Sequence, residues 1–463
     1  MNRKPLFSKR MKTLVLALTI SLTGWLSYSF VDQNFEIAKN LEIFSTLFRE
    51  LTFNYVDEVN PGELMKTGID EMLSSLDPYT NFIPESELED YQFMTTGQYG
   101  GIGSLIQKKG DYIMISDPYE GFPAQKAGLL PGDIILSIND KDMKNKDASE
   151  VTALLKGQPG TTLNMLIKRE GEESPIQKSI TREIVKIDNI PYYGMVDEQT
   201  AYIKLTGFTN NAAREVRDAL VKLKESNNVK QLILDLRGNG GGLLNEAVNI
   251  TNLFVEKGRP VVSTKGKIKE RNSIHKTLSP AFDAEIPLAI LVNSGSASAS
   301  EIVAGAIQDF DRGIIIGQRT FGKGLVQEPV MFADGSAMRL TIARYYTPAG
   351  RCIQKPYING SDDDYFTDLE NRYLNGEFTE KDSIHLADTV KYFTSSGRVV
   401  YGGGGIMPDN FIPFDTTGGS KYLNIISRKG LEYQFCFEYA DANRKKLAQF
   451  TDANSINNYL ENQ

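Results

Sequence analysis

The sequence predicts a multidomain α+β protein, and three observations support this fold class. The chain has 463 residues, which is enough for more than one domain. An N-terminal helical segment with apolar residues at helical spacing is followed by a β-rich region of short strands and glycine turns. Strands then alternate with helices, which is typical of an α/β layered core, and a C-terminal helical extension follows.

Residues 1–30 have the organisation of an export segment. Basic residues at positions 3–12 precede an apolar stretch over residues 14–26. Ser21 and Gly24 interrupt this stretch, so both a cleaved signal peptide and an N-terminal anchor in the inner membrane stay open. We expect the basic side to remain in the cytoplasm, which makes the rest of the chain periplasmic or exported.

The next region, residues 34–95, is predicted to be mainly helical. Phe35, Leu41 and Phe48 belong to a set of apolar residues at helical spacing. Pro61 can open a second helix, because its ring suits the first helical position. Asp77-Pro78 indicates a turn.

Residues 96–185 are predicted to form a small β-rich domain. Strands are expected over residues 112–116, 134–138 and 163–168, with a short helix over 148–156. The string Tyr99-Gly-Gly-Ile-Gly103, followed by Ala127-Gly-Leu-Leu-Pro-Gly-Asp133, resembles a PDZ domain. In that family a glycine loop offers backbone N–H groups to the terminal carboxylate of a peptide, and the peptide adds a strand to the sheet.

The PDZ resemblance implies a binding loop for a peptide carboxylate at Gly100, Gly101, Ile102 and Gly103. Glycine suits this chemistry because the backbone must approach the anion closely and turn its N–H groups inward. Arg169 ends a predicted strand of this domain, where it is either a link from the PDZ domain to the core or a solvated side chain, as arginines at strand ends usually are.

Two glycine-rich strings resemble nucleotide-binding loops but depart from them. Gly238-Asn-Gly-Gly-Gly-Leu243 lacks the third glycine of a dinucleotide loop, because Leu243 stands there. Gly317-Gln-Arg-Thr-Phe-Gly-Lys-Gly324 ends on a glycine, where a phosphate-binding loop needs a hydroxyl for Mg²⁺. A predicted strand, not a helix, follows at Leu325–Phe332. Nucleotide binding is therefore not expected.

A serine and lysine pair explains the same region better. Gly295-Ser-Ala-Ser-Ala-Ser-Glu301 lies where an apolar strand changes to a helical pattern, so a serine there can present its hydroxyl at the start of a helix. Lys323 can act as a base if apolar surroundings lower its pKa, and candidates for these are Ile314–Ile316 and Phe321. The two histidines, His275 and His385, lie outside glycine- or serine-rich turns. Spacing does not choose among the three serines.

Three ordered strings resemble the carboxyl-terminal processing (tail-specific) serine peptidases. They are Asp235-Leu-Arg-Gly-Asn-Gly-Gly-Gly-Leu-Leu244, Gly295–Gly305 and Thr320-Phe-Gly-Lys-Gly-Leu-Val-Gln327. The resemblance implies a ClpP/crotonase-like peptidase core over residues 186–415. It also implies an endopeptidase that recognises the free C-termini of protein substrates through its PDZ domain, with no cofactor and no metal. A PDZ adaptor with an inactive core is the alternative.

The resemblance also implies a role for particular residues. Ser298 would be the nucleophile, Lys323 the base, and Gln327 the residue that orients the lysine. The backbone N–H groups of Ala299 and of a glycine in the Gly240–Gly242 run, in particular Gly242, would form the oxyanion hole. Glu301 is expected to stabilise the first turn of the helix.

The remaining features concern charge, cysteines and the C-terminal part. A net charge of −8 argues against nucleic acid as a partner, which would need a basic excess. Arg237 is expected to pair with an acidic neighbour. Cys352 and Cys436 allow either a disulfide or two separate thiols. We expect an insertion at about residues 358–395. Residues 416–463 are predicted to be helical, packing on the core or forming an interface with a second copy or a regulatory adaptor.

Overall fold

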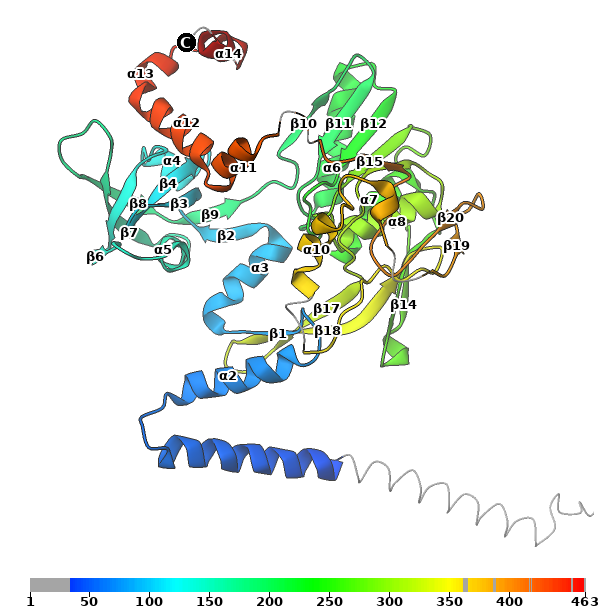
Figure 1. The fold of residues 1–463 in the computed structure, drawn as a ribbon, viewed down its shortest axis with the longest axis horizontal. Coiled ribbons are helices and arrows are strands. Elements are labelled where there is room, and N and C mark those ends of the chain that lie inside the picture. The colour runs from blue at the N-terminus through cyan, green and yellow to red at the C-terminus, as the bar shows by residue number, and fades with distance from the viewer. Residues whose placement is uncertain are drawn as a thin grey trace, which may run out of the picture. The chain divides into compact units, whose positions relative to one another are not determined.

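The computed structural model describes residues 34–360, 365–385, 389–415, 417, 419–450 and 453–461 (Figure 1). It contains two compact units, one ending at Leu76 and the other beginning at Asp77. The predicted export segment at residues 1–30 lies outside the described residues. Within the part of the chain that is described, no helix combines the length and apolar character needed to span a membrane.

The first unit is helical, as predicted. It contains a helix over residues 34–54 and α2 (Pro61–Ser74). Asn60 caps α2, since its side-chain oxygen accepts a hydrogen bond from the Gly62 N–H at 2.9 Å, and Pro61 occupies the first helical position.

The turn predicted at Asp77-Pro78 is present, but the chain after it contributes a strand where a helix was predicted. β1 (Asn81–Ile83) pairs antiparallel with β18 (Ala337–Tyr346), with Asn81 opposite Arg339. Only three residues are extended, which is too short a run for a hydrophobic period to reveal. α3 (Leu88–Thr96) follows and ends at Gly97, whose φ of 67° suits glycine at a helix C-terminus.

The region that resembles a PDZ domain is an antiparallel sheet with the strand order β3-β4-β5-β7-β8, and β6 pairs with β5. Alternate residues of these strands are buried in one apolar cluster, which includes Ile113, Ile115, Leu163 and Met165. Two further strands, β2 and β9, pair with each other beside it. The bounds are β2 (Gln98–Gly101), β3 (Ser104–Lys109), β4 (Tyr112–Pro118), α4 (Pro123–Lys126), β5 (Ile134–Ile138), β6 (Lys141–Asp142), α5 (Ala148–Leu155), β7 (Thr162–Lys168), β8 (Ile176–Thr181) and β9 (Glu183–Lys186).

The predicted peptidase core is a six-stranded sheet with the order β10-β11-β12-β15-β16-β21. All neighbours are parallel except β10, and three helices pack their apolar residues with those of the strands in one buried cluster. The bounds are β10 (Tyr192–Met195), β11 (Thr200–Lys204), α6 (Ala212–Ser226), β12 (Gln231–Asp235), α7 (Leu244–Phe254), β15 (Leu288–Val292), α8 (Ala299–Asp309), β16 (Ile314–Gly317) and β21 (Asn410–Phe411).

A second, antiparallel sheet begins one of its strands directly after the turn that contains Lys323, the predicted base. Its order is β1-β18-β13-β14, and β17 also pairs antiparallel with β18, along Ala337–Arg344. The additional strands are β13 (Pro260–Gly266), β14 (Ser273–Lys276) and β17 (Leu325–Met331). β17 confirms the strand predicted after Gly324, and it excludes the helix that a phosphate-binding loop would need.

The C-terminal part contains short elements. The segment predicted as an insertion, residues 358–395, holds α10 (Asp368–Leu374) and β19 (Tyr392–Phe393). β19 pairs with β20 (Val399–Val400), which lies beyond that segment. Helices predicted beyond residue 416 are present as α11 (Lys421–Arg428), α12 (Leu431–Ala442), α13 (Arg444–Leu447) and α14 (Ala453–Glu461). No disulfide joins Cys352 to Cys436 in the described chain.

Candidate active site

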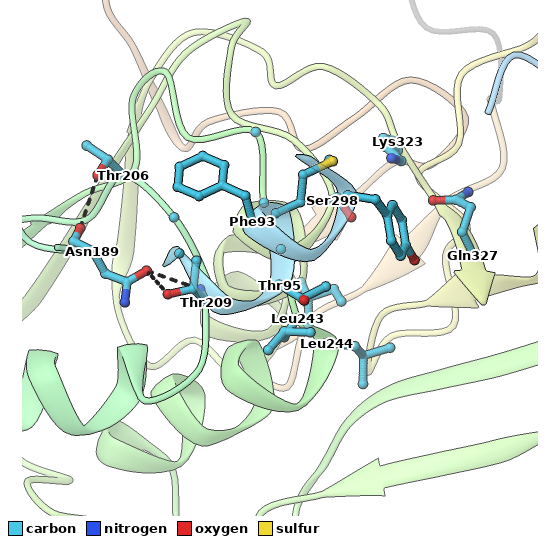
Figure 2. Close-up of a pocket in the computed structure, with 18 of the residues that line it drawn as sticks. Phe93, Thr95, Asn189, Thr206, Thr209, Leu243, Leu244, Ser298, Lys323 and Gln327 are labelled. Atoms are coloured by element: carbon cyan, nitrogen blue, oxygen red, sulfur yellow. Dashed lines mark hydrogen bonds between the residues drawn. The ribbon is translucent and has the colours of Figure 1, made fainter. Parts of the chain in front are cut away.

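Ser298 from the serine string and Lys323 from the lysine string line one cavity of about 730 Å³ (Figure 2). Ser298 lies at the start of α8, Lys323 lies in the turn before β17, and Gln327 lies on β17. The glycine run after β12 forms another wall, and α3 contributes Phe93 and Thr95. Parallel strands place their carboxyl ends at one edge, which brings the loops after β12 and β15 together.

The structure distinguishes Ser298 from the serines on either side. Ser296 and Ser300 are fully buried, and each donates its hydroxyl to a backbone carbonyl: Ser296 to Leu236 at 2.7 Å and Ser300 to Asn239 at 2.9 Å. Of the three, Ser298 is the one that lines the cavity. Structural hydrogen bonds therefore account for Ser296 and Ser300, and Ser298 is positioned to meet a substrate.

Ser298 lies at a sharp turn between β15 and α8. Its φ of 55° with ψ of −113° is unusual for a residue with a side chain. Such a conformation is strained and persists only where neighbouring contacts enforce it. One of these contacts comes from Glu301, whose carboxylate accepts the Ser298 N–H at 2.8 Å.

The glycine run packs directly on this turn. A Cβ added to Gly241 would lie 2.8 Å from the Ser298 Cβ and 2.9 Å from the Ala299 nitrogen. Gly241 also has a φ of 103°, so both space and conformation require glycine. Asn239 holds the run in place, because its carbonyl accepts the Ala297 N–H at 3.0 Å and its side-chain oxygen accepts the Gly241 N–H at 2.9 Å.

The predicted oxyanion hole includes Ala299, at the first turn of α8, and Gly242, which lines the cavity. The N–H of Gly241 already donates to the Asn239 side chain, so Gly242 is a better candidate than Gly241 for the second donor of the oxyanion hole. The oxyanion role of Gly242 and Ala299 stays a prediction.

Lys323 is held in surroundings that favour its neutral form. Burial is the main cause that lowers its pKa, to about 8, and the positive charge of Arg339 lowers it further, while Glu301 and Asp77 act in the opposite direction. Of the apolar residues considered as its surroundings, Ile314–Ile316 belong to β16 of the core sheet, whereas Phe321 packs on an apolar cluster that contains Tyr79. The ring over the lysine amine is that of Tyr79.

Glu301 links the turn of the serine to the turn of the lysine, a role beyond the helix stabilisation that we expected. Its fully buried carboxylate accepts the backbone N–H groups of Ser298, Gly322 and Lys323 at 2.8, 2.8 and 2.9 Å. It also accepts the Thr320 hydroxyl at 2.5 Å. Burial raises its pKa to about 7, and these hydrogen bonds oppose that rise. Its position three residues after Ser298 is the sequence signal of a capping box.

Tyr345 provides a second link, and nothing in the sequence pattern indicated it. Its hydroxyl lies 2.6 Å from the carbonyl oxygen of Lys323 and 3.0 Å from that of Ser298. The side chain is buried at 1% exposure, which raises its pKa well above the usual value. It therefore stays a neutral donor between the two turns.

Gln327 lies on the same side of the cavity as Lys323, as Figure 2 shows. Its side-chain nitrogen is 3.3 Å from the Thr341 hydroxyl, which in turn donates to Asp77 at 2.9 Å. The orientation of Lys323 by Gln327 stays a prediction.

In the predicted carboxylate-binding loop, close packing explains why two positions are glycine. A Cβ on Gly100 would lie 2.2 Å from the Gly157 carbonyl oxygen, and one on Gly103 would lie 2.5 Å from the Phe122 Cβ. Gly100 and Gly101 belong to β2, whereas Ile102 and Gly103 connect it to β3. Binding of a carboxylate at these residues stays a prediction.

Two arginines whose roles were considered from the sequence bind carboxylates within their own domains. Arg237 donates to Asp235 at 2.9 and 2.7 Å, which confirms the expected acidic partner. Arg169 donates to the buried Asp133 at 2.7 Å and to the Gly128 carbonyl at 2.8 Å, inside the PDZ domain. The link from Arg169 to the core stays a prediction. Within the described residues, no group of three His, Cys, Asp or Glu side chains is arranged to hold a metal ion.

Comparison with known proteins identifies two family models in the chain. The model for peptidase family S41 matches residues 199–365, and the PDZ domain model matches residues 114–169. The probable CtpA-like serine protease of Staphylococcus aureus is 34% identical over 349 residues, 74% of this chain and 68% of that protein. The carboxy-terminal-processing protease of Bartonella bacilliformis is 35% identical over 326 residues, 68% of this chain and 73% of that protein.

A solved structure is also similar. The photosystem II D1 C-terminal processing protease is 27% identical, and the match covers 80% of this chain and 92% of that chain with a TM-score of 0.41.

Proposed function

The chain belongs to peptidase family S41 and is a serine protease, and we propose that it cuts peptide bonds through an acyl-enzyme on Ser298 with Lys323 as the general base. One observation carries this proposal. Ser298 and Lys323 line the same cavity, and the pKa of the lysine is lowered to about 8 there, so a useful fraction is neutral near pH 7.

The proposed reaction has two halves. The Ser298 oxygen attacks the peptide carbonyl carbon while the Lys323 amine takes the hydroxyl proton. The N–H groups of Ala299 and Gly242 stabilise the oxyanion, and the amine product leaves with the proton that Lys323 returns. Water then attacks the ester carbonyl while Lys323 takes a proton from it, and Lys323 passes this proton to the Ser298 oxygen as the acid product leaves.

We propose that the PDZ domain binds the free C-terminal tails of protein substrates. A PDZ domain offers a sheet edge for strand addition and a glycine loop for the terminal carboxylate. In this chain the candidate edge is β3, and the candidate loop runs through Ile102 and Gly103 directly before it. We further propose that the protein is exported, because of the basic and apolar pattern in residues 1–30.

A single assay tests the catalytic pair. Ser298→Ala and Lys323→Ala are expected to reduce cleavage of an unfolded protein substrate at least about 1,000-fold, as removal of a nucleophile or base does. Exposed residues of the same types, changed as Ser179→Ala and Lys265→Ala, provide matched controls with normal activity. Full cleavage by Ser298→Ala would contradict the acyl-enzyme. Absence of cleavage by the unmodified chain, with tail binding intact, would favour an adaptor.

A further inference from the structure

The ring that lies over Lys323 comes from a distant part of the chain. The lysine Nζ is 4.0 Å from the ring centroid of Tyr79, within the range of a cation–π contact. Tyr79 precedes β1 and is only 9% exposed. It lies outside both segments that match family models, at residues 114–169 and 199–365. The surroundings of the proposed base are therefore completed from outside the matched peptidase segment.

The position of Tyr79 is determined by contacts at both ends of the residue. Its hydroxyl is 2.9 Å from the Tyr365 hydroxyl, and the two rings meet edge to face. Its backbone N–H donates to Asp77 at 3.0 Å, and its carbonyl accepts from the Arg339 guanidinium at 3.0 Å. A ring held at both ends can hold a flexible lysine in one place.

Charged groups approach Lys323 from three other elements. Arg339 on β18 lowers its pKa, whereas Glu301 on α8 and Asp77 before β1 raise it. The neutral hydroxyl of Tyr345, also on β18, lies at the lysine carbonyl. Burial nevertheless dominates, and the Tyr79 ring provides part of that burial.

We propose that Tyr79 is a positioning residue for the general base: its ring holds the Lys323 amine at the cavity that Ser298 lines and keeps water away from it. The inference rests on the proposed role of Lys323. The ring attracts the ammonium form, but its exclusion of water disfavours that form more strongly, because burial is the largest influence on this lysine. Loss of the ring therefore makes the neutral amine scarcer near pH 7.

The pH dependence of kcat/KM, measured with the full chain and a labelled unfolded protein, tests this role. In the unmodified protein kcat/KM should rise with pH through about 8, as Lys323 loses its proton. In Tyr79→Ala this rise should move to higher pH by at least about one unit. At pH 7 kcat/KM should therefore fall about tenfold, and at high pH it should return to the value of the unmodified protein. Tyr346→Ala is the matched control. Tyr346 lies on β18, the strand of Arg339, and its ring centroid is 4.6 Å from the Nζ of Lys265, so this variant removes a different lysine–tyrosine contact.

Two milder variants keep the ring in place. Tyr79→Phe removes the hydrogen bond between the two hydroxyls and should move the rise by about 0.3 pH units or less. Tyr365→Phe removes this bond and also the one that the Tyr365 hydroxyl accepts from Gln354 at 3.2 Å, so its shift should be at least as large as that of Tyr79→Phe. The double variant should move the rise no further than Tyr365→Phe, since that single variant already breaks the bond between the two hydroxyls. These variants retain the buried rings and therefore test the proposal even if Tyr79→Ala does not fold.

Two results would overturn the inference. One is a Tyr79→Ala rise at the same pH as in the unmodified protein while Lys323→Ala is inactive, which leaves the proposed function intact. The other is a Tyr79→Phe shift of about one pH unit or more, which would assign the effect to the hydroxyl instead of the ring. Activity in Lys323→Ala would instead contradict the general base itself, and with it the proposed function.

Discussion

Ser298 shows how one strained residue is stabilised by its neighbours. Its φ of 55° costs on the order of 1–3 kcal/mol for a residue other than glycine. Glu301 accepts its N–H, Tyr345 lies at its carbonyl oxygen, and Gly241 packs against its Cβ. These contacts come from different parts of the chain, and together they hold the hydroxyl at the cavity. The strain is therefore supported by the tertiary structure.

At this scale we predict that Glu301→Gln disables the site while the fold is retained. The carboxylate accepts three backbone N–H groups and one hydroxyl, whereas an amide offers one oxygen and turns an NH₂ toward donors. We expect kcat to fall at least about 100-fold and stability to fall by about 2–3 kcal/mol. Kinetics and urea unfolding measure the two effects. The exposed Glu256→Gln is the control, and normal kcat in Glu301→Gln would show that the two turns need no common acceptor.

At the scale of elements, β1 illustrates a strand that depends on its partner. Its three residues pair with β18, the strand that also carries Arg339 and Tyr345. The turn before it is built on Asp77, which accepts the N–H groups of Tyr79 and Thr80 at 3.0 and 3.1 Å. This turn delivers the Tyr79 ring to Lys323, so a short element outside the core sheet shapes the proposed base.

We predict that Asp77→Ala loosens β1 and reduces activity. The carboxylate accepts bonds from four donors, including the hydroxyls of Thr80 and Thr341 at 2.6 and 2.9 Å. Their loss should accelerate hydrogen exchange of the amides of residues 79–83 at least about tenfold, while those of the PDZ domain keep their protection. Asp57→Ala, at an exposed position, serves as the control. Unchanged protection of residues 79–83 would contradict this account of the turn.

At the scale of the whole molecule, the second unit combines a PDZ domain and a peptidase core with separate apolar clusters. Separate clusters allow each domain to bind its own part of a substrate. The proposed order of events is that the PDZ domain binds the tail and the cavity of Ser298 receives a more distant segment.

This division predicts a dependence on the free carboxylate of the tail. The Ser298→Ala chain should bind a peptide with a free C-terminus at least about tenfold more tightly than the same peptide with a C-terminal amide, because the glycine loop is proposed to bind an anion. Titration with both peptides measures this ratio. A peptide with a scrambled sequence but a free C-terminus reports the contribution of its side chains. Equal affinity for acid and amide would exclude tail recognition by carboxylate.

Much of the fold followed from local patterns. The predicted strand at 134–138 is β5, and the predicted helix at 148–156 is α5 without its last residue. The helical pattern predicted at the serine string is α8. These elements have strong periodicity and clear caps. β1 was missed because three residues carry no period, and its extended form depends on pairing with β18. Tyr79 and Tyr345 were missed for a related reason, since their roles arise from partners far away in sequence.

The sequence alone determined the family resemblance, the order of the domains and the two strings that hold Ser298 and Lys323, because these are properties of local order and spacing. Only the tertiary structure decided which of the three serines faces the cavity and which side chains surround the lysine. Ser296 and Ser300 are bound to carbonyls of a neighbouring loop, and Lys323 is covered by a ring more than 200 positions earlier in the chain. Burial and hydrogen bonding depend on such distant partners, and therefore on the folded chain.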